Sequence, residues 1–160
     1  MATAETKPSE TYEAGCHCGF ISLSVTLSPP FPEHLVNQCN CSICRRAGYL
    51  LVYPRYEQVK WHHDSDKRVG RYQFNTKTRD HMFCPKCGVS IGIDFDHQDP
   101  KVYGISVRQF NNVDLDSVKY KYFDGVHKME PAVDMSRKQV DVGTGENVSS
   151  SSRKLHEELV

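Results

Sequence analysis

The seven cysteines of this 160-residue chain constrain its fold more than any other feature, because they fall into three tight clusters. The first cluster has the spacing C-x-C, the second C-x-C-x-x-C and the third C-x-x-C. In chain order they are Cys16 and Cys18, then Cys39, Cys41 and Cys44, then Cys84 and Cys87. Such close spacing is typical of zinc sites, whereas cysteines that only fill a core would be scattered. We therefore expect the clusters to bind metal.

A disulfide framework is the other use of clustered cysteines, and the sequence argues against it. The count of seven is odd, so one thiol would stay unpaired. Residues 1–13 lack the basic start and apolar run of a signal peptide, and no stretch reaches the roughly 18 apolar residues of a membrane span. We expect an intracellular protein, cytoplasmic by default with a nuclear location left open, in which thiols stay reduced.

Ligand counting divides the cysteines into four and three. A structural zinc is tetrahedral and takes four protein ligands. The first and third clusters together supply four thiolates, which predicts a closed structural site that joins the start of the chain to its middle. The second cluster supplies three thiolates and leaves one coordination position open. Three protein ligands and an exchangeable fourth are typical of a catalytic zinc.

A histidine could close the second site and make it structural only. The candidates are His17, His34, His62, His63 and His81. The C-x-C-x-x-C run has no histidine at the spacing of a zinc finger, so the sequence favours the open site and keeps the closed one as the alternative. The other partition combines the second cluster with one flanking pair, and it is less economical because two thiols remain unused.

Short runs of alternating or β-branched residues predict a mainly β fold of short antiparallel strands. In residues 20–27, four apolar side chains alternate with serine or threonine, which indicates a half-buried strand. Further strand-like runs cover residues 35–38, 50–56, 59–62, 70–74, 90–95 and 102–107. One short helix is predicted over residues 42–47, where it would begin beside the second cysteine cluster.

The length and composition fit one domain with tails. Apolar residues make up 38% of the chain and charged residues 25%, which is enough for one modest core. Residues 1–11 are polar and are expected to be disordered, and residues 12–125 form the predicted domain. After Gly125 the strand pattern ends, and residues 126–160, which include a serine run, are expected to be largely disordered.

Three motifs together resemble one known family. They are GCHCG at residues 15–19, CNCSICR at residues 39–45 followed by Gly48, and FCPKCG at residues 83–88. Their order and spacing resemble the glutathione-dependent formaldehyde-activating enzyme and centromere protein V family over roughly residues 12–125. The resemblance implies the Mss4-like β fold and two zincs per chain. It assigns the structural zinc to the C-x-C and C-x-x-C pairs and the catalytic zinc to Cys39, Cys41 and Cys44.

The resemblance also implies an activity. The family name points to the reversible joining of glutathione and formaldehyde as S-hydroxymethylglutathione, so a carbon–sulfur lyase or synthase acting on glutathione or a related thiol is expected. An open zinc could take the thiol sulfur as its fourth ligand and keep it deprotonated. The family is mixed, since centromere protein V is linked to chromatin and the cytoskeleton. A non-catalytic, zinc-stabilised binding module, associated with chromatin, the cytoskeleton or nucleic acid, therefore remains the alternative.

A basic segment follows the second cysteine cluster. Residues 45–80 hold nine lysines and arginines against four acidic residues. Arg45 and Arg46 adjoin the cluster and are candidates to bind the carboxylates of glutathione. Elsewhere in this segment a solvated strand face is the simpler interpretation. Because basic and acidic residues number 20 each over the whole chain, nucleic acid is not expected as a partner. The lack of an apolar span argues against a membrane, and the resemblance implies a glutathione-like small-molecule thiol as the partner. The sequence does not indicate an oligomeric state.

Overall fold

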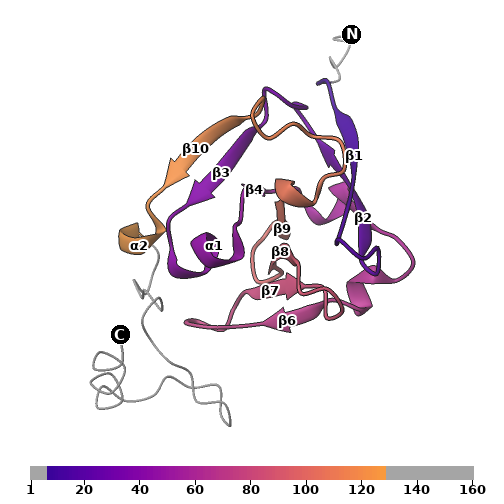
Figure 1. Cartoon of the computed structure of the whole chain (residues 1–160). Helices are drawn as coiled ribbons and strands as arrows, with labels where there is room; N and C mark the ends of the chain where they lie inside the picture. Colours follow the sequence, from indigo (N-terminus) through magenta and orange to yellow (C-terminus); the bar gives the residue numbers. More distant parts are fainter. Residues whose placement is uncertain (1–6, 129–160) are drawn as a thin grey trace, which may run out of the picture.

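The computed structural model describes residues 7–128 of the chain (Figure 1). The strands are β1 (Glu10–Gly15), β2 (Ser22–Leu27), β3 (Leu35–Cys39), β4 (Leu51–Val52), β5 (Val59–Trp61), β6 (Gly70–Tyr72), β7 (Asp80–Phe83), β8 (Ser90–Phe95), β9 (Val102–Ser106) and β10 (Lys119–Phe123). The helices are α1 (Ser42–Ala47) and α2 (Gly125–Lys128), and 3₁₀ turns are η1 (Tyr56–Gln58), η2 (Ser65–Lys67) and η3 (Val107–Gln109). Within the described part of the chain, no helix has the length and apolar character that crossing a membrane requires.

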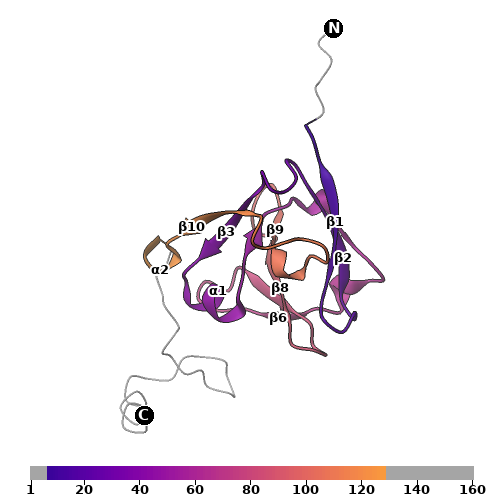
Figure 2. The same cartoon turned by 45° about the horizontal axis from the view of Figure 1, so that its top comes forward.

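The strands form two sheets, which confirms the predicted mainly β fold. The larger sheet has the order β10-β3-β4-β9-β8-β7-β6, and the smaller has the order β1-β2-β5. Figure 1 shows the larger sheet curving from β10 and β3, past β9 and β8, to β7 and β6, with β1 and β2 at the opposite side of the molecule. Figure 2 shows the same separation from a second direction. The strand pairs are antiparallel apart from β10 and β3, which run parallel.

The core is built from the alternating apolar residues of β2 and the facing strands of the larger sheet. Leu23, Val25 and Leu27 are at most 1% exposed, which confirms the face predicted from their spacing. The same apolar cluster contains Met82 of β7 and Ile105 of β9, so the two sheets share one core. This shared core fixes the loops at the ends of β1, β3 and β7, where the cysteines lie.

The ends of the domain differ from the sequence expectation. β1 begins at Glu10, inside the segment 1–11 expected to be disordered. Residues Glu10 and Thr11 pair with β2, and the Thr11 hydroxyl lies 2.8 Å from that of Thr26, so polar side chains here accompany strand pairing rather than disorder. At the other end, α2 extends to Lys128, beyond the expected boundary at 126. The rest of the expected tail, 129–160, lies outside the described residues.

Candidate metal centre

The first and third cysteine clusters meet in space. The four Sγ atoms of Cys16, Cys18, Cys84 and Cys87 lie within 4.8 Å of one another. The Sγ of Cys18 is 3.6 Å from that of Cys16 and 3.8 Å from that of Cys84. Zinc–thiolate bonds of about 2.3 Å in a tetrahedron place sulfurs roughly 3.8 Å apart. The donor set and its spacing therefore fit a zinc ion with four thiolate ligands.

Two tight turns present these four thiols. Gly19 and Gly88 have φ of +76° and +75°, a left-handed conformation that glycine adopts without steric cost. The backbone N–H of Ile21 donates to Cys16 Sγ at 3.2 Å, and that of Cys87 donates to Cys84 Sγ at 3.5 Å. Hydrogen bonds from backbone N–H groups, that of Val89 foremost, lower the pKa of Cys87 to about 6. The backbone of the second turn therefore favours the thiolate of Cys87, the form that binds zinc.

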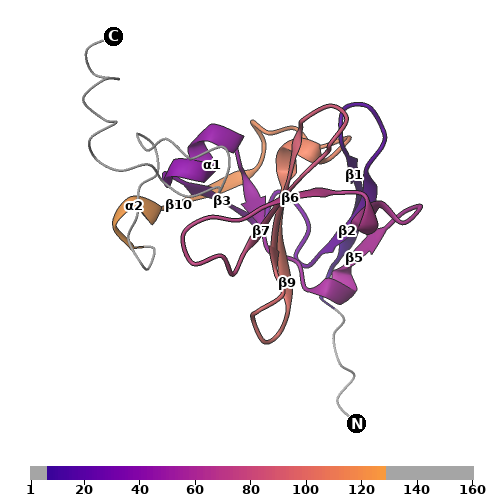
Figure 3. The same ribbon diagram turned by 90° about the horizontal axis from the view of Figure 1, so that it is seen from below.

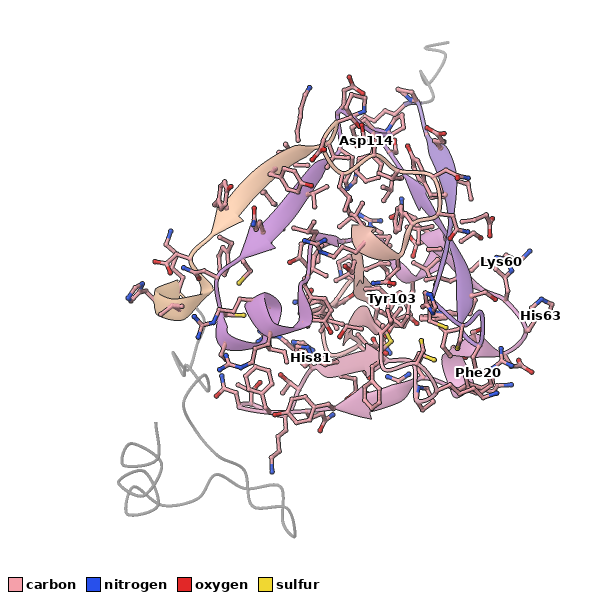
Figure 4. The ribbon with its side chains drawn as sticks, viewed as in Figure 1. Phe20, Lys60, His63, His81, Tyr103 and Asp114 are labelled. Carbon is pink, nitrogen blue, oxygen red and sulfur yellow. The ribbon has the colours of Figure 1, made fainter. Side chains whose placement is uncertain are left out.

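The second cluster lies where β3 ends and α1 begins. Cys39 is the last residue of β3, Cys41 is the N-cap of α1, and Cys44 lies in its first turn, with all three Sγ atoms within 4.8 Å of one another. In Figure 4 sulfur atoms gather beside α1 and, separately, near Phe20. The helix Ser42–Ala47 has the bounds that the sequence predicts, and it places the third thiol beside the first two.

The ionisation of the three thiols in the second cluster would be favoured by a bound cation. Hydrogen bonds from the thiols of Cys39 and Cys44, followed by the backbone N–H of Cys44, lower the pKa of Cys41. The hydrogen bond with Cys41 raises the pKa of Cys39, and hydrogen bonds with Cys39 and Cys41 raise the pKa of Cys44. The protein alone therefore favours ionisation of Cys41 over that of the other two thiols. A bound zinc would let all three ionise, so the donor chemistry fits the metal.

Gly125, near the C-terminal end of the domain, packs against the second cysteine cluster. A Cβ atom at this position would lie 2.5 Å from Cys39 Sγ and 2.9 Å from Cys41 Cβ, so no larger residue fits without displacing the thiols. The side-chain amide of Asn40 donates to Asp124 Oδ1 at 2.9 Å, and the backbone N–H of Val126 donates to Asn40 Oδ1 at 3.1 Å. These bonds hold the segment between β10 and α2 against the thiols. Sequence spacing gives no sign of this contact, because 86 residues separate Cys39 from Gly125.

The three thiols of the second cluster line a cavity of about 370 Å³. Its walls come from β3, β4, β7, β8, β10, both helices and the loop between β6 and β7. Figure 3 shows β3, β10, α1 and α2 together on one side of the molecule. Aromatic side chains of Tyr53, Phe74 and Phe95 line the cavity, and its charged lining residues are Arg79 and Lys128. Among the described lining residues none is acidic.

His81 is the histidine of the predicted set that enters this cavity. Its side chain lies between α1 and β7 (Figure 4) and is 6% exposed. Burial lowers the pKa of His81 to about 4, so the ring is neutral near pH 7. Its nitrogens do not join the group of ligand atoms that lie within 4.8 Å of one another, which contains the three thiols alone in residues 7–128.

The other candidate histidines lie elsewhere. His62 faces Glu13 at 3.4 Å, and His34 Nδ1 lies 2.9 Å from the Pro29 carbonyl oxygen. His17 is exposed, and His63 lies at the edge of the molecule far from α1 (Figure 4). None of these histidines belongs to either thiol group found in the described chain.

The arginines of the basic segment are placed differently from the sequence expectation. Arg45 and Arg46 are exposed in the last turn of α1, where Arg46 donates to the Ser42 carbonyl oxygen at 3.2 Å, and neither lines the cavity. Arg79 does line it, with its guanidinium carbon 5.7 Å from the centre of the Phe95 ring. The Nε of Arg79 is buried and has no hydrogen-bond partner among the described residues. Sequence spacing could not separate Arg79 from the other basic residues of the segment.

Comparisons with known proteins agree with this geometry. The family model described as glutathione-dependent formaldehyde-activating enzyme matches residues 11–125. A crystal structure of a Rhodobacter sphaeroides protein is similar to this chain, with 27% sequence identity and a TM-score of 0.57. That similarity covers 68% of this chain and 99% of the bacterial one. The chain described here therefore belongs to the glutathione-dependent formaldehyde-activating enzyme family.

Proposed function

We propose that this protein is a zinc-dependent carbon–sulfur lyase or synthase that joins formaldehyde to glutathione, or to a related thiol, and releases it again. The observation that carries the proposal is the second thiol cluster, which lines a cavity and has three ligands, with no fourth in residues 7–128. A closed structural site needs four protein ligands, whereas a site that takes a substrate keeps one position free. Family membership supplies the thiol and the aldehyde as the substrates to test.

The two clusters would have different tasks. Cys16, Cys18, Cys84 and Cys87 would hold a structural zinc, and Cys39, Cys41 and Cys44 a second zinc beside the cavity. When bound there, zinc would supply a positive charge that favours the deprotonated form of a substrate thiol. In the forward reaction the carbon–sulfur bond forms while the carbonyl π bond breaks. The thiol releases its proton to solvent, and the oxygen of the adduct takes a proton from solvent.

The chain's own residues would bind and shield the substrate. Tyr53, Phe74 and Phe95 surround the cavity with apolar surface, which limits water near the reacting atoms. Arg79 offers a guanidinium whose Nε lacks a partner in the described chain, and glutathione carries two carboxylates that suit it. The substrate thiol would thus be held at its sulfur and at an anionic end.

The activity can be tested although thiols and formaldehyde combine spontaneously. Two-dimensional exchange NMR measures interconversion of glutathione and S-hydroxymethylglutathione at equilibrium. We expect zinc-loaded protein to raise the exchange rate in proportion to its concentration. Metal analysis should give two zincs per chain, one of them removed by mild chelation together with the activity and without unfolding. An exchange rate equal to that with bovine serum albumin, and two equally inert zincs, would favour the non-catalytic binding module.

Replacement of Arg79 tests the anionic end of the substrate. Arg79→Ala should raise the KM for glutathione by about tenfold to a hundredfold, because a charge-assisted hydrogen bond contributes about 1.5–3 kcal/mol. The KM for cysteamine, a thiol without a carboxylate, should stay unchanged. Arg45→Ala is the matched comparison, since Arg45 adjoins the cysteines in sequence but lies outside the cavity. A larger effect at Arg45 would support the candidate taken from the sequence and contradict the role of Arg79.

A further inference from the structure

We propose that His81 donates a hydrogen bond to the oxygen of the aldehyde and of the hydroxymethyl adduct during the reaction. This inference rests on the proposed function, and it assigns to the same site a residue that contacts the reacting oxygen. It follows from the placement of the ring, from a ring nitrogen without a partner in the described chain, and from the separation of the ring from the metal ligands.

The backbone and the ring of His81 are both fixed. His81 lies in β7, paired with Tyr72 of β6 on one side and Ile93 of β8 on the other. Its ring stacks on Tyr49, with centroids 6.1 Å apart and an interplanar angle of 23°, and lies 5.3 Å from Phe74. The Tyr49 hydroxyl donates to the Gly92 carbonyl oxygen at 3.1 Å and so anchors the stack. A donor held in this way needs little reorganisation during a reaction.

Neither nitrogen of the ring has a hydrogen-bond partner in the described chain. Nδ1 of His81 is buried, and no group of the described chain forms a hydrogen bond with it. Native proteins leave few buried polar atoms unsatisfied, because burial without a hydrogen bond is unfavourable. The side chain lines the cavity that also contains the three thiols. Nδ1 itself is closed to solvent, so a ligand oxygen in this cavity would meet the ring at Nε2.

His81 is placed beside the metal ligands rather than among them. The ligand atoms that lie within 4.8 Å of one another are the sulfurs of Cys39, Cys41 and Cys44, and no His81 nitrogen belongs to that group. In the hydroxymethyl adduct one carbon joins the sulfur to the oxygen. An adduct whose sulfur is held at the cysteine cluster therefore places its oxygen in the same cavity. His81 lines that cavity and has an unused hydrogen-bonding nitrogen.

The proposed step balances without a proton leaving the ring. The thiolate electron pair forms the carbon–sulfur bond, and the carbonyl π pair moves to oxygen. His81 keeps its proton while its N–H stabilises the developing negative charge, and water then protonates the oxygen. In the reverse direction water removes that proton, and the same N–H stabilises the oxyanion from which the thiolate leaves.

The first test measures turnover and metal content together. In His81→Phe the ring can still stack on Tyr49, but the donor is absent, so the exchange rate constant at saturating glutathione should fall by about a hundredfold to a thousandfold. His81→Gln restores an N–H donor and should recover part of the rate. Both variants should keep two zincs per chain and the wild-type KM for glutathione. His34→Phe is the control, because His34 lies outside the cavity.

The second test separates this inference from the proposed function. Calorimetry with zinc-loaded protein compares 2-mercaptoethanol with 1-propanethiol, which replaces the hydroxyl by a methyl group. Wild type should bind the hydroxyl-bearing thiol about fivefold more tightly, and His81→Phe should lose this preference. If wild type shows the preference but no catalysis, the oxygen-binding role stands and the proposed reaction fails. Loss of one zinc in His81→Phe, or unchanged turnover and preference, would overturn the inference.

Discussion

Cys84→Ser is expected to leave the protein largely unfolded at room temperature. Cys84 is fully buried, belongs to the core cluster, and supplies one of four sulfurs that join β1, β2, β7 and β8. Structural zinc contributes about 10–16 kcal/mol to the folding of small zinc domains, whereas a whole domain is stable by only about 5–15 kcal/mol. Circular dichroism and zinc analysis of the purified variant check this result directly.

A control separates the loss of zinc from the cost of burying a serine hydroxyl. Cys84→Ala removes the ligand but leaves no buried hydroxyl, so both variants should unfold to a similar extent if zinc is the main contribution. A strong chelator at elevated temperature should unfold the wild type as well. If Cys84→Ser keeps a cooperative thermal transition within a few degrees of wild type, the first cluster does not hold the fold together.

Cys44→Ser is expected to abolish catalysed exchange while the protein stays folded. Serine is a poor zinc ligand, so the second site would keep two thiolates and lose its metal, and the rate should fall by more than about a hundredfold. The fold should survive because Cys39 and Cys44 are close in sequence, whereas Cys18 and Cys84 are 66 residues apart. The entropic cost of closing a loop grows with the logarithm of the loop length. A metal that closes the longer loop therefore stabilises the folded state by about 2 kcal/mol more.

Thermal melting and exchange NMR on the same preparation check this second result. The expected combination is a melting temperature within a few degrees of wild type, one zinc per chain and background exchange. Ser42→Ala is a matched control, because Ser42 is buried in the same helix and contributes no sulfur. Unfolding of Cys44→Ser as complete as that of Cys84→Ser would contradict the different tasks proposed for the two clusters.

Local patterns predicted the elements that depend on local forces. The alternation of Leu23, Val25 and Leu27 predicts one buried face, and β2 buries that face. The helix 42–47 is also observed with the expected bounds, because its cap at Cys41 and the left-handed Gly48 at its end are short-range features. The grouping of the cysteines into four and three follows from the four-ligand coordination of structural zinc. The two thiol groups found within residues 7–128 have the predicted members.

Features that depend on distant contacts could not be predicted from one sequence. β10 has the sequence KYKYF and exposes most of its side chains, so it lacks the alternation of a half-buried strand, and only its parallel pairing with β3 defines it. Gly125 looks like an ordinary loop glycine until its contact with Cys39 is known. Arg79 and Arg45 are equally basic in sequence, and the course of the loop before β7 alone places Arg79 in the cavity.

The parallel pairing of β10 with β3 sets an order in which the two sites can be completed during synthesis. All ligands of the first site have been made once the ribosome has passed Cys87, and β7 and β8 can then fold around them. The second site has its three sulfurs by Cys44, but its outer wall arrives only with β10 and Gly125, some 80 residues later. In a nascent chain, the four thiols of the first cluster would thus be available to a metal ion before the cavity beside the second cluster is closed.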